Sequence, residues 1–435
     1  MARSKAFLRG FLALAVVVPA CVQLREGPLT SGSAGTGPGG ATDGEGGEGG
    51  KGLGGHAGKA TAGAGVDGGT GGTMTVGGTS LGGQSDAGQS GAPELGGAGD
   101  GDTGGNSHCN VKNTPVDASC ELEAPSCDGL TTKCGADHES CCTSTHLPGV
   151  EYIRSYDASK TVSQDGVAVV GYQDQNSAAA KMDGFWLDRY EVTVGRFRKF
   201  VEAYDGWRQN KPFNEDGKVL DVNGTGWNKT TMDPALPGDA VTLGASLTFA
   251  ACGDKVTWTS TPAGAEDMPV NCVRWAVAFA FCIWDGGRLP TEAEWNYAAA
   301  AGAQQRAFPW SDPASQAITP DADHANLESA GVLAVGARAP GKWGHQDLAG
   351  NVFEWTRDAC TDCNTPSNKT PGADLDDYLD TTCIHCVHTS GPNRIMRGGS
   401  WKFQKAFGRT AARAANSPLN AYDDLGFRCA RNPAP

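Results

Sequence analysis

The stretch Trp275-Ala-Val-Ala-Phe-Ala-Phe-Cys-Ile-Trp284 and the segment that follows it decide the fold. The run is apolar on almost every side, which is typical of a helix buried all round rather than of an amphipathic surface helix. Gly286-Gly287 follows at once, and glycine is the residue that most readily ends a helix. The stretch therefore predicts one central helix inside a folded core.

A second helix is predicted directly after this one, opening at Leu289-Pro-Thr-Glu-Ala-Glu294. Thr291 and Glu294 have the spacing of a capping box, in which each side chain accepts a hydrogen bond from the backbone N–H of the other residue. Trp295, Ala298 and Ala299 supply the apolar stripe of this helix.

A third helix is expected from Thr193, which is placed to cap it. The apolar residues that follow recur at helical spacing: Val194, Phe197, Phe200, Val201 and Tyr204. The remaining sequence is rich in Gly, Pro and Trp, with short segments and long loops. This composition predicts an irregular α+β domain over residues 148–435 with little regular secondary structure, and not a parallel α/β sheet.

Seven blocks, in order, resemble the signature of the formylglycine-generating-enzyme (sulfatase-modifying factor) family. They are Gly184-Phe-Trp-Leu-Asp-Arg-Tyr-Glu-Val-Thr193, Met268-Pro-Val-Asn-Cys-Val-Arg-Trp275, Gly287-Arg-Leu-Pro-Thr-Glu-Ala-Glu-Trp295, Phe308-Pro-Trp310, Asp347-Leu-Ala-Gly-Asn-Val-Phe-Glu-Trp355, Arg397-Gly-Gly-Ser-Trp401 and Leu425-Gly-Phe-Arg428. The resemblance implies an irregular variant of the C-type-lectin-like fold. It implies nothing certain about activity, because one fold hosts many functions.

The family's oxidase converts a cysteine of a sulfatase to formylglycine, with molecular oxygen and with copper held by two cysteines just after the Arg-Gly-Gly-Ser block. Thiolates are soft ligands that select Cu(I). The corresponding stretch here, Trp401-Lys-Phe-Gln-Lys-Ala-Phe-Gly-Arg-Thr410, has no cysteine, and neither has any position from Arg397 to Arg428. We therefore expect no copper and assign no catalytic or cofactor-binding residue. The family's iron-dependent relatives carry an H-x3-H motif, which is also absent.

The resemblance also implies two structural features. Cys282 and Cys429 match a pair that the family bridges by a disulfide, which ties the buried helix to the last strand. Asp347, Gly350, Val352 and Glu354 match a family calcium site. Carboxylates at both ends with backbone carbonyls between them form the hard-oxygen set that calcium prefers, and the alternative is that both carboxylates only cap local turns.

Four further cysteines have a spacing that falls within a structural-zinc pattern: Cys360, Cys363, Cys383 and Cys386. Two disulfides are the alternative, which an exported protein favours. Cys252 and Cys272 are the last expected pair. Setting aside Cys21, the chain's 15 cysteines leave an even number, as full pairing requires.

The N-terminal residues 1–21 are typical of a signal peptide. Arg3, Lys5 and Arg9 form a basic region, and the apolar run Phe11–Val18 is too short to span a bilayer. The small residue before Cys21 resembles a bacterial lipoprotein processing site, at which Cys21 would carry the lipid. Ordinary secretion, with cleavage near Ala20, is the alternative.

Two segments separate the signal peptide from the α+β domain. Residues 22–107 are a Gly-rich stretch that cannot bury enough apolar surface to fold, so we expect a disordered tether. Residues 108–147 hold six cysteines among few large apolar residues, which predicts covalent staples of unknown connectivity: Cys109, Cys120, Cys127, Cys134, Cys141 and Cys142. A zinc knuckle is the alternative for this segment.

From the sequence we expect a surface-tethered protein that binds or scaffolds an envelope ligand or protein, as an outer-membrane or cell-surface lipoprotein or else a secreted or periplasmic protein. The alternative is a protein- or metabolite-modifying oxidase or oxygenase of the same family that uses a non-standard site. Nucleic acid is not an expected partner, because 49 acidic residues outnumber 35 basic ones.

Overall fold

A computed structural model describes residues 118–155, 161–164, 167–170, 179–313, 320–361 and 383–433. The signal peptide, the Gly-rich segment, Cys21, Cys109 and Cys363 lie outside these residues. The described residues belong to one compact unit that runs from Gly97 to Pro435.

The three predicted helices are present. Helix α4 spans Trp275–Trp284, is buried along nearly its whole length and ends before Gly286, whose φ is +79°. Helix α5 spans Glu292–Ala300 and begins with the predicted capping box of Thr291 and Glu294. Helix α1 spans Val194–Arg208, and its cap Thr193 accepts a hydrogen bond from the backbone N–H of Arg196.

The remaining elements are short, as the composition predicted. The other helices are α2 (Lys229–Met232), α3 (Ala240–Ser246), η1 (Pro125–Cys127), η2 (Asp233–Ala235), η3 (Ala250–Cys252), η4 (Gly302–Gln304) and η5 (Lys405–Gly408). Among the described residues no single helix is both long and apolar enough to cross a membrane, and one bent pair, Lys229–Ala235 with Ala240–Cys252, meets that test by length and composition only.

The strands are equally short. They are β1 (Ser119–Glu121), β2 (Lys133–Cys134), β3 (Glu139–Ser140), β4 (Thr143–Leu147), β5 (Val150–Ile153), β6 (Thr161–Gln164), β7 (Val167–Val170), β8 (Ala179–Met182), β9 (Phe185–Asp188), β10 (Phe353–Cys360), β11 (Cys383–Ile384), β12 (Asn393–Arg397), β13 (Ala414–Asn416), β14 (Leu425–Gly426) and β15 (Ala430–Arg431). The chain is thus a mixed α+β fold with little regular secondary structure.

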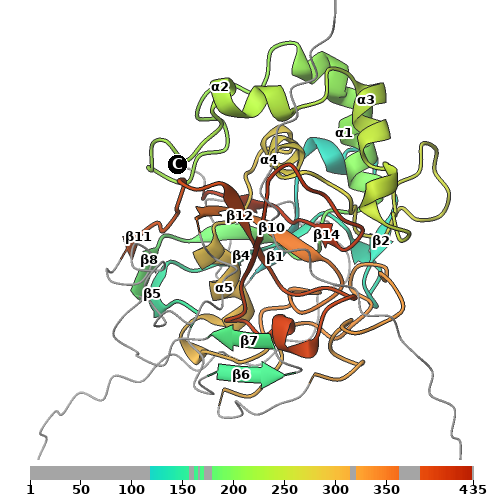
Figure 1. Ribbon diagram of the computed structural model, residues 1–435. Helices are drawn as coiled ribbons and strands as arrows, with labels where there is room; N and C mark the ends of the chain where they lie inside the picture. The colour runs from blue at the N-terminus through green and yellow to red at the C-terminus, as the bar shows by residue number, and fades with distance from the viewer. Residues whose placement is uncertain are drawn as a thin grey trace, which may run out of the picture. The chain divides into compact units, whose positions relative to one another are not determined.

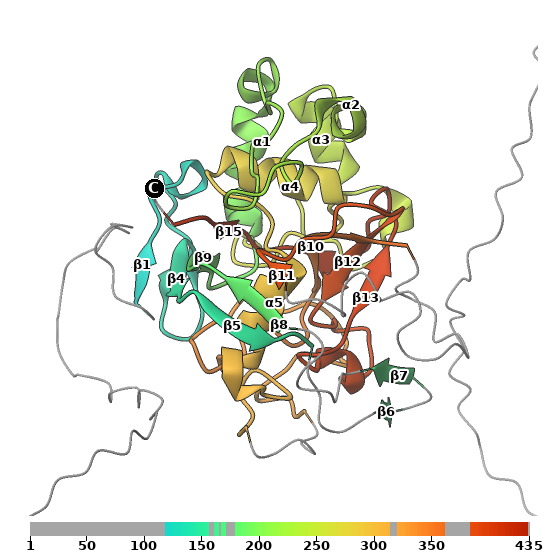
Figure 2. The ribbon, with the colours of Figure 1, turned by 90° about the vertical axis from the view of Figure 1, so that its left-hand side faces the viewer.

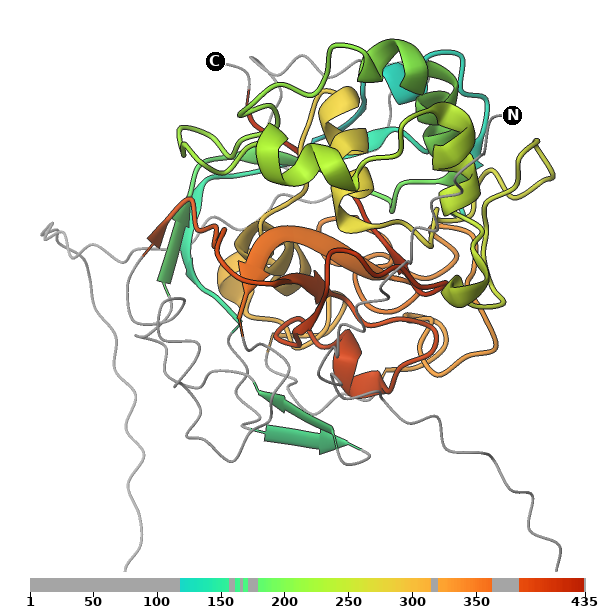
Figure 3. The same ribbon diagram turned by 45° about the horizontal axis from the view of Figure 1, so that its top comes forward.

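One four-stranded sheet has the order β13-β12-β10-β14 and carries the main core on one face. Helices α1 to α4 gather on that face of the sheet, and α5 lies on the other (Figures 1 and 3). Trp355 of β10 and Met396 of β12 pack with α4 in the main core. Glu354, the neighbour of Trp355 on β10, faces α5 instead and accepts a hydrogen bond from Trp295 Nε1.

A second sheet, β1-β4-β9-β15, joins the two ends of the described chain (Figure 2). Strand β4 of the cysteine-rich segment pairs with β9, and β15 pairs with the other edge of β9. The cysteine-rich segment therefore completes the same sheet as the C-terminal strand.

Disulfides tie these parts together. Cys282–Cys429 joins α4 to the C-terminal strand region, and Cys252–Cys272 forms as the sequence suggested. The cysteine-rich segment holds Cys127–Cys142 and Cys134–Cys141, and Cys120 is also disulfide-bonded. Within the described part of this segment, covalent staples rather than a zinc knuckle are present.

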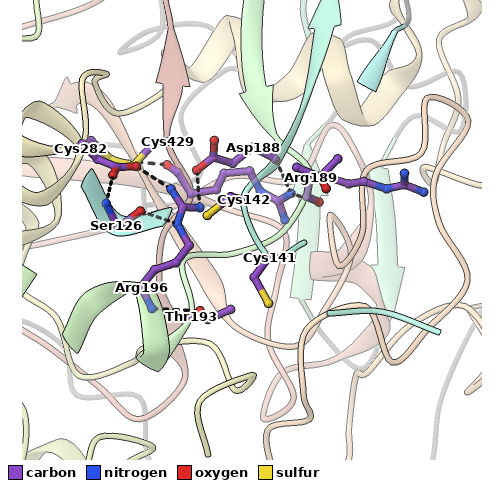
Figure 4. A network of polar contacts seen from close by, with 12 residues as sticks. Ser126, Cys141, Cys142, Asp188, Arg189, Thr193, Arg196, Cys282 and Cys429 are labelled. Carbon is purple, nitrogen blue, oxygen red and sulfur yellow. Dashed lines mark hydrogen bonds and ion pairs between the residues drawn. A yellow bond between two sulfur atoms is a disulfide. The ribbon is translucent and has the colours of Figure 1, made fainter. Parts of the chain in front are cut away.

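A buried ion-pair network lies where the cysteine-rich segment meets the helices (Figure 4). The Arg196 guanidinium contacts Asp188 at 2.8 Å and Asp285 at 2.6 Å, and Arg431 contacts both aspartates as well. Ser126 of η1 donates its backbone N–H to Asp285 and accepts a bond from Arg196 Nε. We call these four charged residues, Asp188, Arg196, Asp285 and Arg431, the balanced cluster.

Candidate functional site

The stretch Trp401–Thr410, which the sequence resemblance aligns with the oxidase's copper cysteines, follows strand β12 and the turn at Gly398-Gly399. Both glycines have positive φ, and a Cβ at Gly399 would lie 3.0 Å from the Phe407 backbone. The close approach of the two backbones therefore requires a small residue here.

Aromatic rings fill this stretch. Phe403 and Phe407 pack edge to face at a centroid distance of 5.3 Å, and both contact Phe353 of β10. The adjoining helix η5 carries Ala406, which is buried. The packing inside this stretch is therefore largely apolar.

Polar contacts hold the start of the stretch against the end of the chain. Ser400 Oγ donates to Asp424 at 2.7 Å, and Lys402 Nζ contacts Asp423 Oδ1 at 2.5 Å. Burial raises the pKa of Asp424, and the hydrogen bond from Ser400 and the Lys402 charge act against that rise. Ser400 is fully buried and donates to a carboxylate, so the arrangement fixes the loop and presents no accessible nucleophile.

Sequence reasoning missed Ser400, Asp423 and Asp424 as partners. The signal available was the Asp423-Asp424 pair directly before the Leu425-Gly-Phe-Arg428 block. That pair became informative only once the fold brought it to the Arg397–Trp401 turn.

The residues of the predicted calcium site lie in a curled loop that leads into β10. Asp347, Gly350 and Asn351 all have positive φ, and a Cβ at Gly350 would collide with the Asn326 backbone. The loop is fixed to the next strand because Gly350 N–H donates to Gly398 O at 2.8 Å. The loop therefore follows a curled path between Asp347 and Glu354.

Glu354 at the end of this loop is paired with a cation that the sequence did not reveal. Arg428 donates to both Glu354 oxygens at 2.7 Å, and both side chains are fully buried. Asp347 Oδ2 accepts the Gly336 N–H at 2.6 Å. Both carboxylates therefore have hydrogen-bond donors within the protein.

A third buried carboxylate, Glu191, joins this group. It accepts bonds from Asn351 Nδ2 at 2.7 Å and from Val352 N–H at 3.2 Å. We call Glu191, Asp347 and Glu354, with Arg428 among them, the acidic cluster. Three carboxylates face one guanidinium, so the group carries excess negative charge when all are ionised.

The pKa values reflect this imbalance. Burial, and then the Asp347 and Glu354 charges, raise the pKa of Glu191 well above its ordinary value. Burial likewise raises the pKa of Asp347 to about 6, although the Gly336 N–H and Arg428 oppose it. Desolvation and like charge both disfavour the ionised forms.

The acidic cluster offers oxygen ligands but not a preassembled cage. Among the described residues no group of three His, Cys, Asp or Glu side chains is arranged to hold a metal ion. Asp347 Oδ1 accepts no hydrogen bond from the described chain, and Glu354 Oε1 accepts only one. A carboxylate oxygen has two lone pairs, so donor capacity and net charge both fit a hard divalent cation.

The structure favours the disulfide alternative for the three insertion cysteines that it describes, Cys360, Cys383 and Cys386. Cys383 and Cys386 are bonded to each other, and Cys360 is also disulfide-bonded. Thiolates that are oxidised to a disulfide cannot ligate zinc. His388, two residues after Cys386, donates its backbone N–H to Asp358, and its Nδ1 lies 3.0 Å from Ala359 O.

Comparison with known proteins gives a family match over most of the folded part. Residues 155–433 match the model of the sulfatase-modifying factor enzyme 1-like domain. A formylglycine-generating enzyme from Mus musculus is 31% identical over 285 residues, which cover 60% of this chain and 70% of that protein. An inactive C-alpha-formylglycine-generating enzyme 2 from Bos taurus is 30% identical over 270 residues, covering 57% and 76%.

Among solved structures, PvdO from Pseudomonas aeruginosa aligns over 67% of this chain and 94% of its own. The sequence identity is 20% and the TM-score 0.44.

Proposed function

The chain belongs to the sulfatase-modifying factor enzyme 1-like family, and from that premise we propose that it is an exported member without oxidase activity that binds or scaffolds a component of the cell envelope. The observation that carries the proposal is the Trp401–Thr410 stretch. Phe403 and Phe407 pack against Phe353 in the stretch that the sequence resemblance aligns with the oxidase's copper thiolates. Two of the relatives, from Bos taurus and Mus musculus, are named inactive C-alpha-formylglycine-generating enzyme 2, whereas others from the same organisms are named formylglycine-generating enzyme.

The test is incubation of the purified protein with a cysteine-containing sulfatase peptide, oxygen and Cu(I), followed by mass spectrometry. We expect the peptide cysteine to stay unmodified, because no soft ligand pair holds copper. A family oxidase under the same conditions is the positive control. Copper-dependent formylglycine at a comparable rate would overturn the proposal and favour the non-standard-site enzyme.

The proposal includes export. The disulfides indicate a protein outside the cytoplasm, where thiols oxidise and stay oxidised. We further propose that Cys21 carries a lipid that anchors the chain at the cell surface. Metabolic labelling with a radioactive fatty acid should mark the wild type and not Cys21→Ser, whereas equal labelling of both would rule the anchor out.

Calcium binding by the acidic cluster is the last part of the proposal. Asp347 and Glu354 would hold the ion with the backbone carbonyls of Gly350 and Val352, and Glu354 would share its charge between the ion and Arg428. The excess negative charge of the cluster supports a divalent cation. The ion would hold the Asp347–Trp355 loop in its curled form.

Millimolar calcium should therefore raise the melting temperature above that in chelator, because it binds only the folded state. Asp347→Asn should reduce this response, and the exposed Glu202→Gln should leave it unchanged. An identical melting temperature in chelator and calcium, with no calcium in the purified protein, would leave the two carboxylates as structural groups only.

A further inference from the structure

The end of the β10–β12 pair carries two arginines on the face that packs against α4. Trp355 of β10 and Met396 of β12 belong to the main core on this face. Arg357 and Arg394 lie two residues away from them, toward the end of the sheet. The pairing register shifts between Trp355 and Ala359, so β10 is irregular in the segment that contains Arg357. Irregularities of this kind re-aim side chains.

Both guanidiniums lie over the same indole ring. The Arg394 Cζ atom is 4.0 Å from the centroid of Trp275, and the Arg357 Cζ atom is 5.3 Å from it. Arg357 also lies 4.9 Å from the Phe279 ring. The Trp275 ring therefore makes cation–π contacts with two side chains of like charge.

The carboxylates near these strands lie on the opposite face. Asp358 accepts the backbone N–H of Glu292 at the start of α5, and Glu292 pairs with Arg397 and Arg413. Within the described chain no carboxylate lies within ion-pair distance of Arg357 or Arg394. The sheet thus separates the two cations from Asp358 and Glu292.

The hydrogen-bond donors of this pair are only partly used. Arg357 donates from Nε to Thr225 O and from Nη2 to Gly226 O, both backbone carbonyls. Its Nη1 is buried and has no partner, and Arg357 is 1% exposed. Arg394 is half-buried and donates from Nη1 to Arg357 O at 3.3 Å. A buried N–H donor without an acceptor destabilises the folded protein, so an acceptor that reached Arg357 Nη1 would remove this cost.

We propose that Arg357 and Arg394 bind a carboxylate group of a ligand over the Trp275 ring. Arg357 Nη1 supplies the buried donor, and the half-exposed Arg394 supplies a guanidinium fork from the solvent side. Planar forks of this kind match the two oxygens of a carboxylate. A single negative charge suits the site, because Glu215 already offsets part of the Arg357 charge. This inference goes beyond the proposed function and stands whether or not the chain oxidises cysteine.

The probe is acetate, titrated at constant ionic strength against chloride while the melting temperature of the full chain is measured. We expect a saturable rise of about 3 °C when acetate is tenfold above its dissociation constant. Arg394→Gln should abolish the rise, and Arg394→Lys, which keeps the charge without the fork, should weaken it.

Arg274→Gln is the matched control, because Arg274 is exposed and also lies over an aromatic ring, that of Phe249, at 5.7 Å. It should leave the acetate response intact. No acetate response in the wild type, or an equal response in Arg394→Gln, would overturn the proposal. A response to sulfate or phosphate without one to acetate would overturn the assignment to a carboxylate.

Discussion

The balanced cluster and the acidic cluster are both buried, but their charges add up differently. In the balanced cluster, two arginines meet two aspartates, and each charge has two opposite partners. In the acidic cluster, three carboxylates share Arg428. Burial alone would raise the pKa of Asp188, yet Arg431 and Arg196 outweigh burial and lower it. The same desolvation raises the pKa of Asp347 to about 6, because its compensation is incomplete.

The difference separates structural charge from charge that is available for a ligand. A cluster whose charges all pair within the protein has no remaining demand for a counter-ion. A cluster with excess charge must either hold protons or take a cation, so its stability depends on pH and on metal. The predictions below test this contrast.

The largest expected effect is in the balanced cluster. Arg196→Met would leave Asp188 and Asp285 with Arg431 alone, and the breaking of a buried pair costs about 3–5 kcal/mol. Urea unfolding would measure the loss. Arg208→Met, which removes a partly exposed pair with Asp233 at 3.6 Å, should cost no more than about 1 kcal/mol. Similar costs for both variants would contradict the contrast.

The Cys282–Cys429 bridge lies beside the balanced cluster (Figure 4) and gives the next effect. Cys282→Ser should lower the free energy of unfolding by about 2–5 kcal/mol, the usual cost of losing a native disulfide. Peptide mapping without reductant would first check the pairing. Either cysteine found alkylated in protein from an oxidising compartment would refute it.

In the acidic cluster we expect an effect of pH. The pKa of Asp347 is raised from 3.8 to about 6 in the folded protein, so the folded state binds more protons than the unfolded state between these values. Its contribution to stability is therefore full below about pH 4 and is lost as the pH rises through about 6, by about 2–3 kcal/mol. About half of this loss, roughly 1.3 kcal/mol, falls between pH 5 and pH 7, and unfolding in chelator at these two pH values measures it.

Asp347→Asn should reduce this pH dependence, and millimolar calcium should do the same in the wild type by removing the repulsion. The exposed Glu202→Gln is the control. If Asp347→Asn left the difference between pH 5 and pH 7 unchanged, the excess charge of the acidic cluster would not be the cause.

The smallest expected effect is at the partly exposed Lys402–Asp423 pair. Lys402→Met should cost about 1 kcal/mol, because Lys402 is partly solvated and Asp423 keeps the Lys255 N–H as a donor. Thermal unfolding at low and high salt measures it. A loss as large as that of Arg196→Met would show that the loop depends on this pair.

Local sequence patterns predicted the helices well. The Trp275–Trp284 run and the Thr291–Glu294 spacing each predict a helix from interactions among residues close in sequence. No tertiary information was needed for either prediction. The irregular α+β character followed from composition in the same way. The disulfide Cys282–Cys429 came from the family resemblance, since its partners are 147 residues apart.

The charge partners could not be predicted. Glu354 and Arg428 are 74 residues apart, and the sequence around either residue does not indicate its partner. Arg357 and Arg394 meet over Trp275 only because the irregularity in β10 and the position of α4 bring them there. Such long-range contacts depend on the whole fold, and short sequence motifs do not specify them.

The β1-β4-β9-β15 sheet has a consequence for how the chain is made. Strand β9 takes β4 on one edge and β15 on the other, and β15 is formed by Ala430–Arg431 near the end of the sequence. At synthesis rates of about 5–20 residues per second, β4 exists roughly 15–60 s before β15 leaves the ribosome. Arg431, which completes the balanced cluster, arrives equally late. One edge of β9 therefore stays open until β15 is made, and Asp188, joined midway by Asp285, stays without Arg431 until then. A chaperone that binds exposed strand edges would find its substrate here.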